Sequence, residues 1–215
     1  MKQAARRVSV AGPAGAIECT IDEPDKPSAG APRGVAVLCH PHPQHGGTMD
    51  NKVVQTLARA FLQLGYRVVR FNFRGVGASA GVWDEGRGEI DDALAVIAAQ
   101  RLAAPGLPLA LGGFSFGGYV AAQAAARLAA DAQNPAPVER LVLVGPATSR
   151  FEMPARVAAD TLLIHGEADD VVPLAATLDW ARPQGLPVIV LPGVGHFFHG
   201  QLTLLKNQVI QAWHV

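Results

Sequence analysis

The sequence predicts an α/β protein, a three-layer α/β/α sandwich on a mainly parallel sheet of roughly eight strands. From Val35 onward, short apolar runs typical of buried strands alternate with longer runs typical of helices. Turns rich in glycine and proline separate these runs. Because 215 residues suit one folding unit, we expect a single domain spanning residues 1–215.

The first half of the chain should begin with an antiparallel hairpin, Arg7–Ala11 with Ala16–Ile21, because two short alternating stretches flank glycine and proline. A loop rich in Pro, Asp and Gly follows over Glu23–Arg33. The elements expected next are a strand over Val35–His40, a loop over Pro41–Thr48, a helix capped by Asp50 or Asn51 and ended by Gly65, a strand over Arg67–Phe73, a loop over Arg74–Gly88 and a helix over Glu89–Leu102.

The stretch Leu107–Ala130 is expected to join a strand to a helix through a tight turn. Leu107–Gly113 is an apolar run of strand length, and the alanine-rich run Tyr119–Leu128 has high helix propensity. After it we expect a loop over Gln133–Pro137, a strand over Arg140–Val144, a loop over Gly145–Asp160, a strand over Thr161–His165, a helix over Leu174–Ala181, a strand over Leu186–Leu191 and a final helix over Gln201–Trp213.

Composition argues against several classes of function. Lysine and arginine together equal aspartate and glutamate at 18 each, so no net charge attracts nucleic acid or an anionic membrane. No apolar run reaches membrane-spanning length, and the basic N-terminal residues are not followed by the apolar core of a signal peptide. Cys19 and Cys39 fall in expected strands, so we expect two buried free thiols, which suits a reducing cytoplasm.

The turn inside Leu107–Ala130 has the pattern G-x-S-x-G, read from Gly113 to Gly117. A serine on so sharp a strand-to-helix turn has a strained backbone, and chain segments crowd it on both sides. Glycine at both ends removes the Cβ atoms that would clash. We therefore predict that Ser115 projects from the edge of the sheet as a nucleophile.

A serine hydroxyl needs a base to take its proton and an acid to orient that base. His196 follows the last expected strand and Asp169 follows the strand before it, at the sheet edge where the strands' carboxyl ends meet. The order Ser115, Asp169, His196 is the one expected for a G-x-S-x-G turn on such a sheet. The competing acid is Asp170 and the competing base is His199.

These two predicted partners of Ser115 also have structural interpretations. Asp169 would then only cap the turn into the following helix, and His196 would be a loop histidine with satisfied hydrogen bonds. Two nearby residues also carry groups that could take part in acid–base chemistry, but we expect other roles for them. We interpret His165 as structural and Glu167 as a solvated charge.

An oxyanion needs two positioned N–H donors. The first should be the backbone N–H of Phe116, directly after the serine. The second should come from the loop after the Val35–His40 strand, where Pro41 and Pro43 have no N–H to offer. We therefore assign the backbone N–H of His42.

The same loop supports a different interpretation. His40, His42 and His45 are closely spaced imidazoles, and such runs ligate zinc in some hydrolases. Two prolines stiffen the loop, and Gln44 stands where an assisting carboxylate is expected. A zinc-dependent hydrolase that uses these three histidines would also leave the G-x-S-x-G turn unexplained.

Four motifs resemble those of the α/β-hydrolase superfamily. The loop beginning Asn72-Phe73-Arg74-Gly75 is similar to the superfamily's D-x-R-G-x-G-x-S loop, with a structural Asn72 in place of the usual acid. The stretch from His40 through Lys52 resembles small bacterial serine hydrolases of about the size of dienelactone hydrolase. The other matching motifs are Gly113-Phe114-Ser115-Phe116-Gly117, His165-Gly166-Glu167-Ala168-Asp169 with Val172-Pro173, and Gly193-Val194-Gly195-His196.

The resemblance also makes a prediction about access to the site. In this superfamily a substrate-shaping lid is usually inserted after the strand that corresponds to Arg140–Val144. Gly145–Asp160 is too short to form one, so we expect an open site without a lid. Its expected walls are Phe116, Trp83, Phe151, Phe197 and the His42–Gly47 loop.

The sequence therefore predicts a serine hydrolase that cleaves a small-molecule carboxylic ester or thioester through an acyl-enzyme, without a cofactor. Ser115 attacks, His196 transfers the proton, Asp169 orients the imidazole, and the N–H groups of His42 and Phe116 hold the oxyanion. The alternatives are a peptidase or acyltransferase with the same three side chains, the zinc-dependent hydrolase, and a binding module without activity on the same scaffold.

Overall fold

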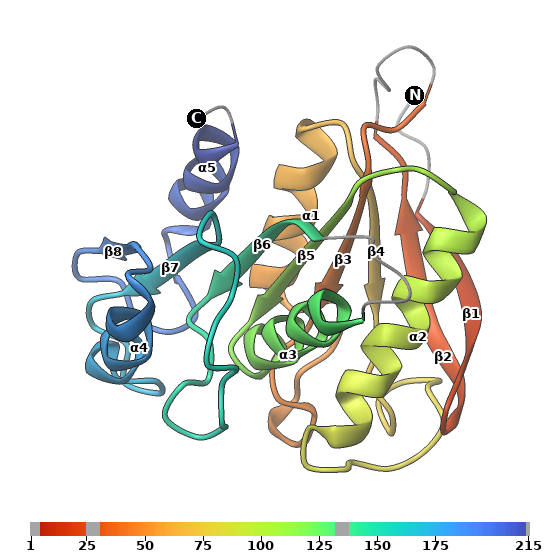
Figure 1. Cartoon of the computed structure of the whole chain (residues 1–215), viewed down its shortest axis with the longest axis horizontal. Helices are drawn as coiled ribbons and strands as arrows, with labels where there is room; N and C mark the ends of the chain where they lie inside the picture. Colours follow the sequence, from red (N-terminus) through yellow and green to blue (C-terminus); the bar gives the residue numbers. More distant parts are fainter. Residues whose placement is uncertain (1–4, 25–30, 132–137, 214–215) are drawn as a thin grey trace.

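The computed structural model describes residues 5–24, 31–131 and 138–213, and the strands within these ranges form one eight-stranded sheet (Figure 1). Their order across the sheet is β1-β2-β4-β3-β5-β6-β7-β8. Only β2 runs against its neighbours, and every other pairing beyond it is parallel, as predicted. The strands are β1 (Arg6–Gly12), β2 (Gly15–Asp22), β3 (Val35–Cys39), β4 (Arg67–Phe71), β5 (Leu109–Phe114), β6 (Val138–Val144), β7 (Leu162–Gly166) and β8 (Val188–Leu191).

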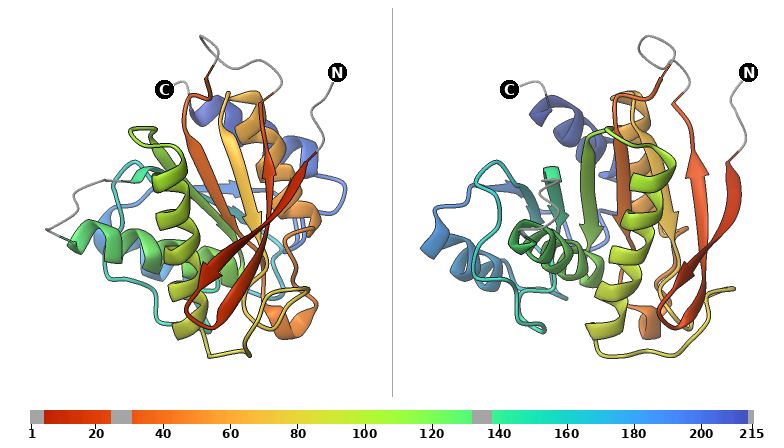
Figure 2. Two further views of the ribbon diagram at one scale, coloured as in Figure 1. Left: turned by 90° about the vertical axis from the view of Figure 1, so that its right-hand side faces the viewer. Right: turned by 45° about the vertical axis from the view of Figure 1, so that its right-hand side comes forward.

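Helices cover both faces of this sheet, which confirms the predicted three layers (Figure 2, left). Helices α2, α3 and α4 pack on one face, with Val96 and Val120 in its core. Helices α1 and α5 pack on the other, with Phe61 and Leu205 in its core. The helices are α1 (Lys52–Gln63), α2 (Arg87–Ala103), α3 (Phe116–Ala130), α4 (Leu174–Ala181) and α5 (Leu202–Ala212), with short 3₁₀ turns η2 (Pro43–His45) and η3 (Arg182–Gln184).

The central strands are apolar along their whole length because both of their faces are covered. Every residue of β3 and β5 is buried, whereas β1 at the sheet edge alternates between exposed and half-buried positions. Strand β3 lies between β4 and β5, with Cys39 opposite Gly113 at its end. The segments that leave β3 and β5 therefore begin side by side.

Of the two residues expected to cap the start of α1, the structure selects Asn51. Its side-chain oxygen accepts hydrogen bonds from the N–H groups of Val53 and Val54 at 2.9 and 3.4 Å. Asp50 instead pairs with a guanidinium nitrogen of Arg70 at 2.8 Å. The predicted ending at Gly65 is confirmed, since its φ of 88° is one that glycine adopts without strain.

The predicted boundaries of the described helices and strands are within two residues of the observed ones, except at the start of α3. Helix α3 begins at Phe116, three residues before the predicted Tyr119, because the turn passes directly into it. Helix α2 begins two residues early, at Arg87 instead of Glu89, since the Glu89 carboxylate accepts the N–H groups of Asp84 and Gly86 and caps this earlier start. The predicted loop 133–137 and residues 25–30 of the predicted loop 23–33 lie outside the described residues.

The connection between β6 and β7, residues 145–161, contains no helix or strand. It crosses the carboxyl edge of the sheet as a compact loop, and a hydrogen bond of 3.0 Å between the side-chain oxygens of Thr148 and Thr177 ties it to α4. The predicted absence of a lid in this connection is therefore confirmed.

The structure also bears on the two cysteines and on membrane-spanning segments. Cys19 and Cys39 are both buried free thiols, as predicted. Among the described residues, no helix has both the length and the apolar surface that crossing a bilayer demands.

Candidate active site

Ser115 lies on the turn between β5 and α3 with φ 56° and ψ −120°, a conformation that is strained for any residue with a side chain. The glycines around it are required by space. A Cβ on Gly113 would lie 2.0 Å from the carbonyl oxygen of Gly117, and one on Gly117 would lie 2.2 Å from that of Cys39. The steric prediction from the G-x-S-x-G pattern is therefore correct.

The three predicted catalytic side chains form one hydrogen-bonded chain. His196 Nε2 lies 3.0 Å from Ser115 Oγ, and His196 Nδ1 lies 2.6 Å from Asp169 Oδ2. Because a carboxylate only accepts, Nδ1 carries the ring proton and Nε2 presents its lone pair to the serine hydroxyl. All three residues are buried, with 8%, 3% and 8% of Ser115, His196 and Asp169 exposed.

Backbone contacts hold the loops that carry His196 and Asp169 together. Strands β7 and β8 end as a pair, with Gly166 opposite Leu191. Beyond this pair, the N–H of Ala168 donates to the carbonyl of Val194 at 3.0 Å. Glu167 is exposed as predicted, but its carboxylate also accepts the N–H of Gly193 at 2.8 Å. These bonds fix the separation of the two loops.

Asp169 caps a turn and also faces His196, so its position fits both the structural and the catalytic interpretation. Its Oδ1 accepts the N–H groups of Val171 and Val172 at 2.9 and 2.7 Å. Burial opposes ionisation of this carboxyl, but the bonds from His196 and these two N–H groups outweigh it and lower the pKa of Asp169. The competitors Asp170 and His199 are both exposed on the same loops and make no contact with Ser115.

His165, which we expected to be structural, approaches the same carboxylate. Its ring is fully buried, with Nε2 2.9 Å from the carbonyl oxygen of Val172 and 3.4 Å from Asp169 Oδ2. Burial lowers the pKa of His165 and keeps the ring neutral. Its Nδ1 has no hydrogen-bond partner within the described parts of the chain. Sequence reasoning missed this contact, although the spacing of four residues between His165 and Asp169 across a turn could have indicated it.

The two predicted oxyanion donors belong to neighbouring segments. His42 follows β3 and Phe116 begins α3, and their rings lie 5.2 Å apart. Neither backbone N–H donates a hydrogen bond to any of the described residues. Both donors are therefore free to bind a group that enters beside Ser115.

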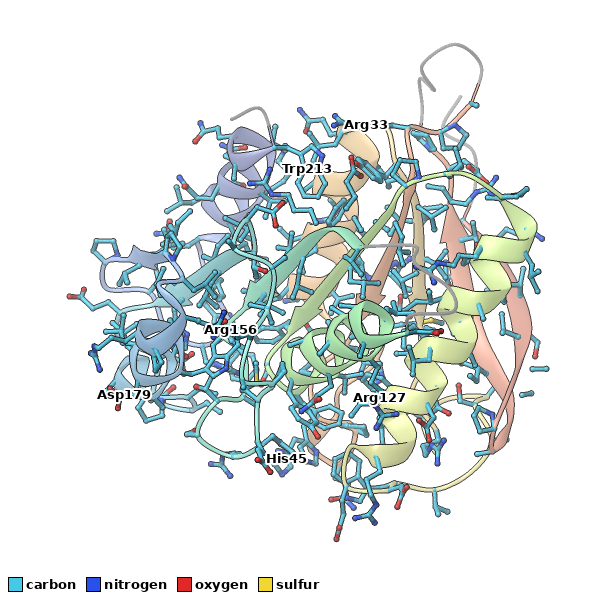
Figure 3. The ribbon with its side chains drawn as sticks, in the orientation of Figure 1. Arg33, His45, Arg127, Arg156, Asp179 and Trp213 are labelled. Atoms are coloured by element: carbon cyan, nitrogen blue, oxygen red, sulfur yellow. The ribbon has the colours of Figure 1, made fainter. Side chains whose placement is uncertain are left out.

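A cavity of about 390 Å³ opens at Ser115. Two of the residues expected to form its walls, Trp83 and Phe197, do not line it. The ring of Trp83 packs 4.5 Å from the ring of His42, and the ring of Phe197 packs 5.0 Å from that of His196. The lining consists of His42, His45, Ser115, Phe116, Ala147, Arg150, Phe151, Val171 and Val172. His45 lies at the lower edge of the molecule in Figure 3, opposite Arg33 and Trp213.

The three histidines of the zinc interpretation are not arranged as ligands. The fully buried His40 contacts the carbonyl oxygen of Pro41 through Nδ1 at 2.6 Å and accepts the N–H of Phe73 through Nε2 at 3.0 Å. The rings of His42 and His45 stack at 4.4 Å. Among the described residues, no three His, Cys, Asp or Glu side chains are grouped as metal ligands.

Asn72 is structural, as the motif comparison implied. Its Nδ2 donates to Glu18 Oε2 at 2.8 Å, and its Oδ1 accepts the N–H of Met49 at 2.9 Å. Glu18 Oε2 also accepts the N–H of Ala78 at 2.9 Å, and this bond, together with the one from Asn72, lowers the pKa of Glu18 against the effect of burial. Sequence reasoning did not connect Glu18 with Asn72.

A strained serine between a central parallel strand and its helix, with a histidine and an aspartate on the last two strands' loops, defines an α/β serine hydrolase. Comparison with known families places the chain more narrowly. The model of the family described as serine aminopeptidase, S33, matches residues 30–159, more than half of the chain. The chain belongs to this family within the α/β-hydrolase superfamily.

Several solved structures are similar over almost the whole chain. A protein of Xanthomonas campestris, described as an α/β serine hydrolase without a lid, is 35% identical, with a TM-score of 0.85 over 100% of this chain and 95% of that one. An α/β serine hydrolase homologue of Coxiella burnetii is 36% identical, with a TM-score of 0.81 over 96% of each chain.

The match to one curated relative covers a shorter stretch of the chain. An uncharacterised protein of Rickettsia prowazekii is 41% identical over 113 residues, which is 52% of this chain and 46% of that protein. The match therefore spans about half the length of this relative.

Proposed function

We propose that this serine hydrolase cleaves carboxylic esters or thioesters through Ser115, His196 and Asp169. The observation that carries the proposal is the continuous hydrogen-bonded chain from Ser115 Oγ to Asp169 Oδ2, at 3.0 and 2.6 Å. It begins at a serine whose strained backbone directs the hydroxyl toward the cavity.

In the first half of the reaction, His196 Nε2 takes the hydroxyl proton while Ser115 Oγ bonds to the acyl carbon. The ionised Asp169 stabilises the imidazolium and keeps the proton of Nδ1 in place. As the tetrahedral intermediate collapses, the bond to the leaving alcohol or thiol breaks and His196 protonates that group. In the second half, water attacks the acyl-enzyme by the same route and releases the acid and free Ser115.

The backbone N–H groups of Phe116 and His42 would stabilise the oxyanion of each tetrahedral intermediate. The support is that both N–H groups lack a partner among the described residues and that both residues line the cavity at Ser115. Such a donor is worth on the order of 10²–10³ in kcat.

A second candidate is an aminopeptidase or another amidase with the same three side chains. The description of the matching family as serine aminopeptidases favours it. A panel of short and long p-nitrophenyl esters, acyl thioesters and aminoacyl p-nitroanilides separates the two candidates, because each predicts a different leaving group.

The proposal is tested by Ser115→Ala. Turnover of p-nitrophenyl acetate and covalent labelling by a fluorophosphonate should both be lost, while circular dichroism stays unchanged. Ser9→Ala is the matched control, because Ser9 is an exposed serine on β1. Activity retained by Ser115→Ala would contradict the proposal, as would labelling at any other residue.

We further propose that the protein works in a reducing compartment such as the cytoplasm. Both cysteines are buried thiols, and burial raises the pKa of Cys19 to about 12, so neither is prepared for disulfide exchange.

A further inference from the structure

The cavity at Ser115 is electrostatically one-sided. Its lining includes Arg150 and the imidazoles of His42 and His45, and it includes no carboxylate. The remaining lining residues apart from Ser115 are apolar. Burial, with His45 and Arg150 nearby, lowers the pKa of His42, so its ring is neutral near pH 7. Arg150 thus provides a permanent positive charge to the cavity.

Arg150 also differs from most arginines of the described chain in having no carboxylate partner. Arginines at eight other positions pair with Asp or Glu within 4.0 Å, including Arg74 with the buried Asp92 at 2.8 Å. Within the described residues, the Arg150 guanidinium makes no ion pair and no side-chain hydrogen bond. Its bonding capacity is therefore available to a molecule in the cavity.

The backbone holds Arg150 at a fixed place relative to the serine. The N–H of Ala147 donates to the carbonyl of Ser115 at 3.2 Å, and the N–H of Arg150 donates to the carbonyl of Ala147 at 3.1 Å. The next residue, Phe151, packs its ring on Phe116 at 5.1 Å. Two hydrogen bonds and a ring contact thus connect the backbone of Arg150 to the turn that carries the nucleophile.

From this arrangement we propose that Arg150 is a specificity-determining residue that selects esters or thioesters bearing a carboxylate a few bonds from the scissile carbonyl. The inference rests on the proposed function and names its substrate class. A guanidinium matches a carboxylate with two parallel hydrogen bonds. One unpaired guanidinium among apolar walls suits a substrate with a single negative charge.

The first test compares substrates of similar shape and different charge. Wild-type protein should hydrolyse mono-p-nitrophenyl glutarate with a kcat/KM roughly tenfold above that for p-nitrophenyl valerate, since a hydrogen bond to a charged group at an accessible site gives about this factor. A second pair, 4-acetoxybenzoate and phenyl acetate, has the carboxylate in the leaving group. A preference in either pair supports the proposal and identifies which side of the ester lies against Arg150. Equal rates in both pairs overturn it.

Variants then assign the preference to the side chain. Arg150→Met should remove it, Arg150→Lys should keep part of it, and Arg150→Glu should reverse it. Arg156→Met is the matched control, because Arg156 is an exposed arginine of the same loop that does not line the cavity and lies apart from His45 in Figure 3. A preference that survives Arg150→Met, or that Arg156→Met abolishes, contradicts the proposal.

A binding measurement separates failure of this proposal from failure of the proposed function. The Ser115→Ala protein should bind monomethyl glutarate roughly tenfold more tightly than methyl valerate in a calorimetric titration, and 0.5 M NaCl should reduce the difference. Neutral esters turned over through Ser115 without any charge preference would leave the proposed function intact and reject the role of Arg150. Charge-selective binding without turnover would support the role of Arg150 and reject the proposed function.

Discussion

His40 and His196 both follow parallel strands at the same edge of the sheet, and both are buried, yet their ring nitrogens face different partners. His196 lies between a carboxylate and a hydroxyl, at 2.6 and 3.0 Å. His40 lies between a backbone carbonyl and a backbone N–H, at 2.6 and 3.0 Å. The distances are the same, so the difference lies only in the chemistry of the partners.

This comparison teaches that burial and hydrogen bonding do not by themselves distinguish a reactive histidine from a structural one. The backbone carbonyl of Pro41 and the backbone N–H of Phe73 are too weak as base and acid to exchange a proton with an imidazole near neutral pH, so His40 only joins two loops. In the proposed reaction, by contrast, the hydroxyl of Ser115 loses its proton to Nε2 of His196, and Asp169 stabilises the cation that results. The following predictions are ordered by the size of the expected effect and separate the two roles.

The largest effect is expected for His196→Ala. Without the proton acceptor, kcat/KM for p-nitrophenyl acetate should fall on the order of 10⁴-fold or more. His199→Ala should stay within about twofold, because His199 is exposed and makes no contact with Ser115. A similar loss in both variants would contradict the assignment of the base.

His40→Leu should cost about 3–4 kcal/mol of unfolding free energy, measured by urea denaturation. The change leaves the carbonyl of Pro41 and the N–H of Phe73 buried without partners and disturbs the contact with the Phe73 ring at 4.5 Å. His45→Leu is the control and should shift stability by about 0.5 kcal/mol or less, since His45 is exposed. Equal effects would show that His40 does not join the loops.

The same histidine should make stability depend on pH. Burial lowers the pKa of His40 from 6.5 to about 4, so the unfolded chain binds a proton more readily than the native one. The stability that the native state has by keeping His40 neutral is therefore fully present above pH 6.5. It is lost as the pH falls from 6.5 to about 4, by about 3 kcal/mol of unfolding free energy.

Urea denaturation at pH 7, 5.5 and 4.5 measures this loss. The His40→Leu variant should have a smaller decline over the same range, and the difference between the two proteins isolates His40 from the other histidines. Parallel declines in the two proteins would show that folding does not lower the pKa of His40.

A smaller effect, about 2 kcal/mol, is expected for Asn72→Asp. The new carboxylate has no N–H to donate and faces Glu18, so a hydrogen bond is replaced by repulsion between like charges. Thermal unfolding measures the loss. Adding Glu18→Gln should restore part of it, because the glutamine amide provides a donor to Asp at position 72 but no longer accepts the N–H of Ala78 there. A double variant no more stable than Asn72→Asp would argue against this pairing.

Much of the fold could be predicted because each element has a local signal. Helix α4 (Leu174–Ala181) has the predicted bounds, and Asn51 and Gly65 mark the ends of α1. Predictions were less accurate at helix starts that depend on the local conformation of the preceding turn. Helix α2 begins early because Glu89 caps it from within, and α3 begins at Phe116 because the strained turn needs no spacer.

For the candidate site, motif and chain order predicted the residues that form the hydrogen-bonded chain, while the walls were partly wrong. Trp83 and Phe197 are large apolar residues, but their rings pack against His42 and His196 and do not line the cavity. Arg150 had no local signal, since only the hydrogen bonds from its loop to Ser115 bring it to the cavity. The contact of His165 with Asp169 likewise depends on the fold of a turn.

The strained turn at Ser115 has a consequence for biosynthesis. His196 lies 81 residues beyond the serine, on the loop that follows the edge strand β8, so a nascent chain folded only through β6 holds the serine hydroxyl without this proton acceptor. The proposed hydrolytic activity would then begin only when β8 has joined the sheet, and a ribosome-bound intermediate would not hydrolyse the esters around it.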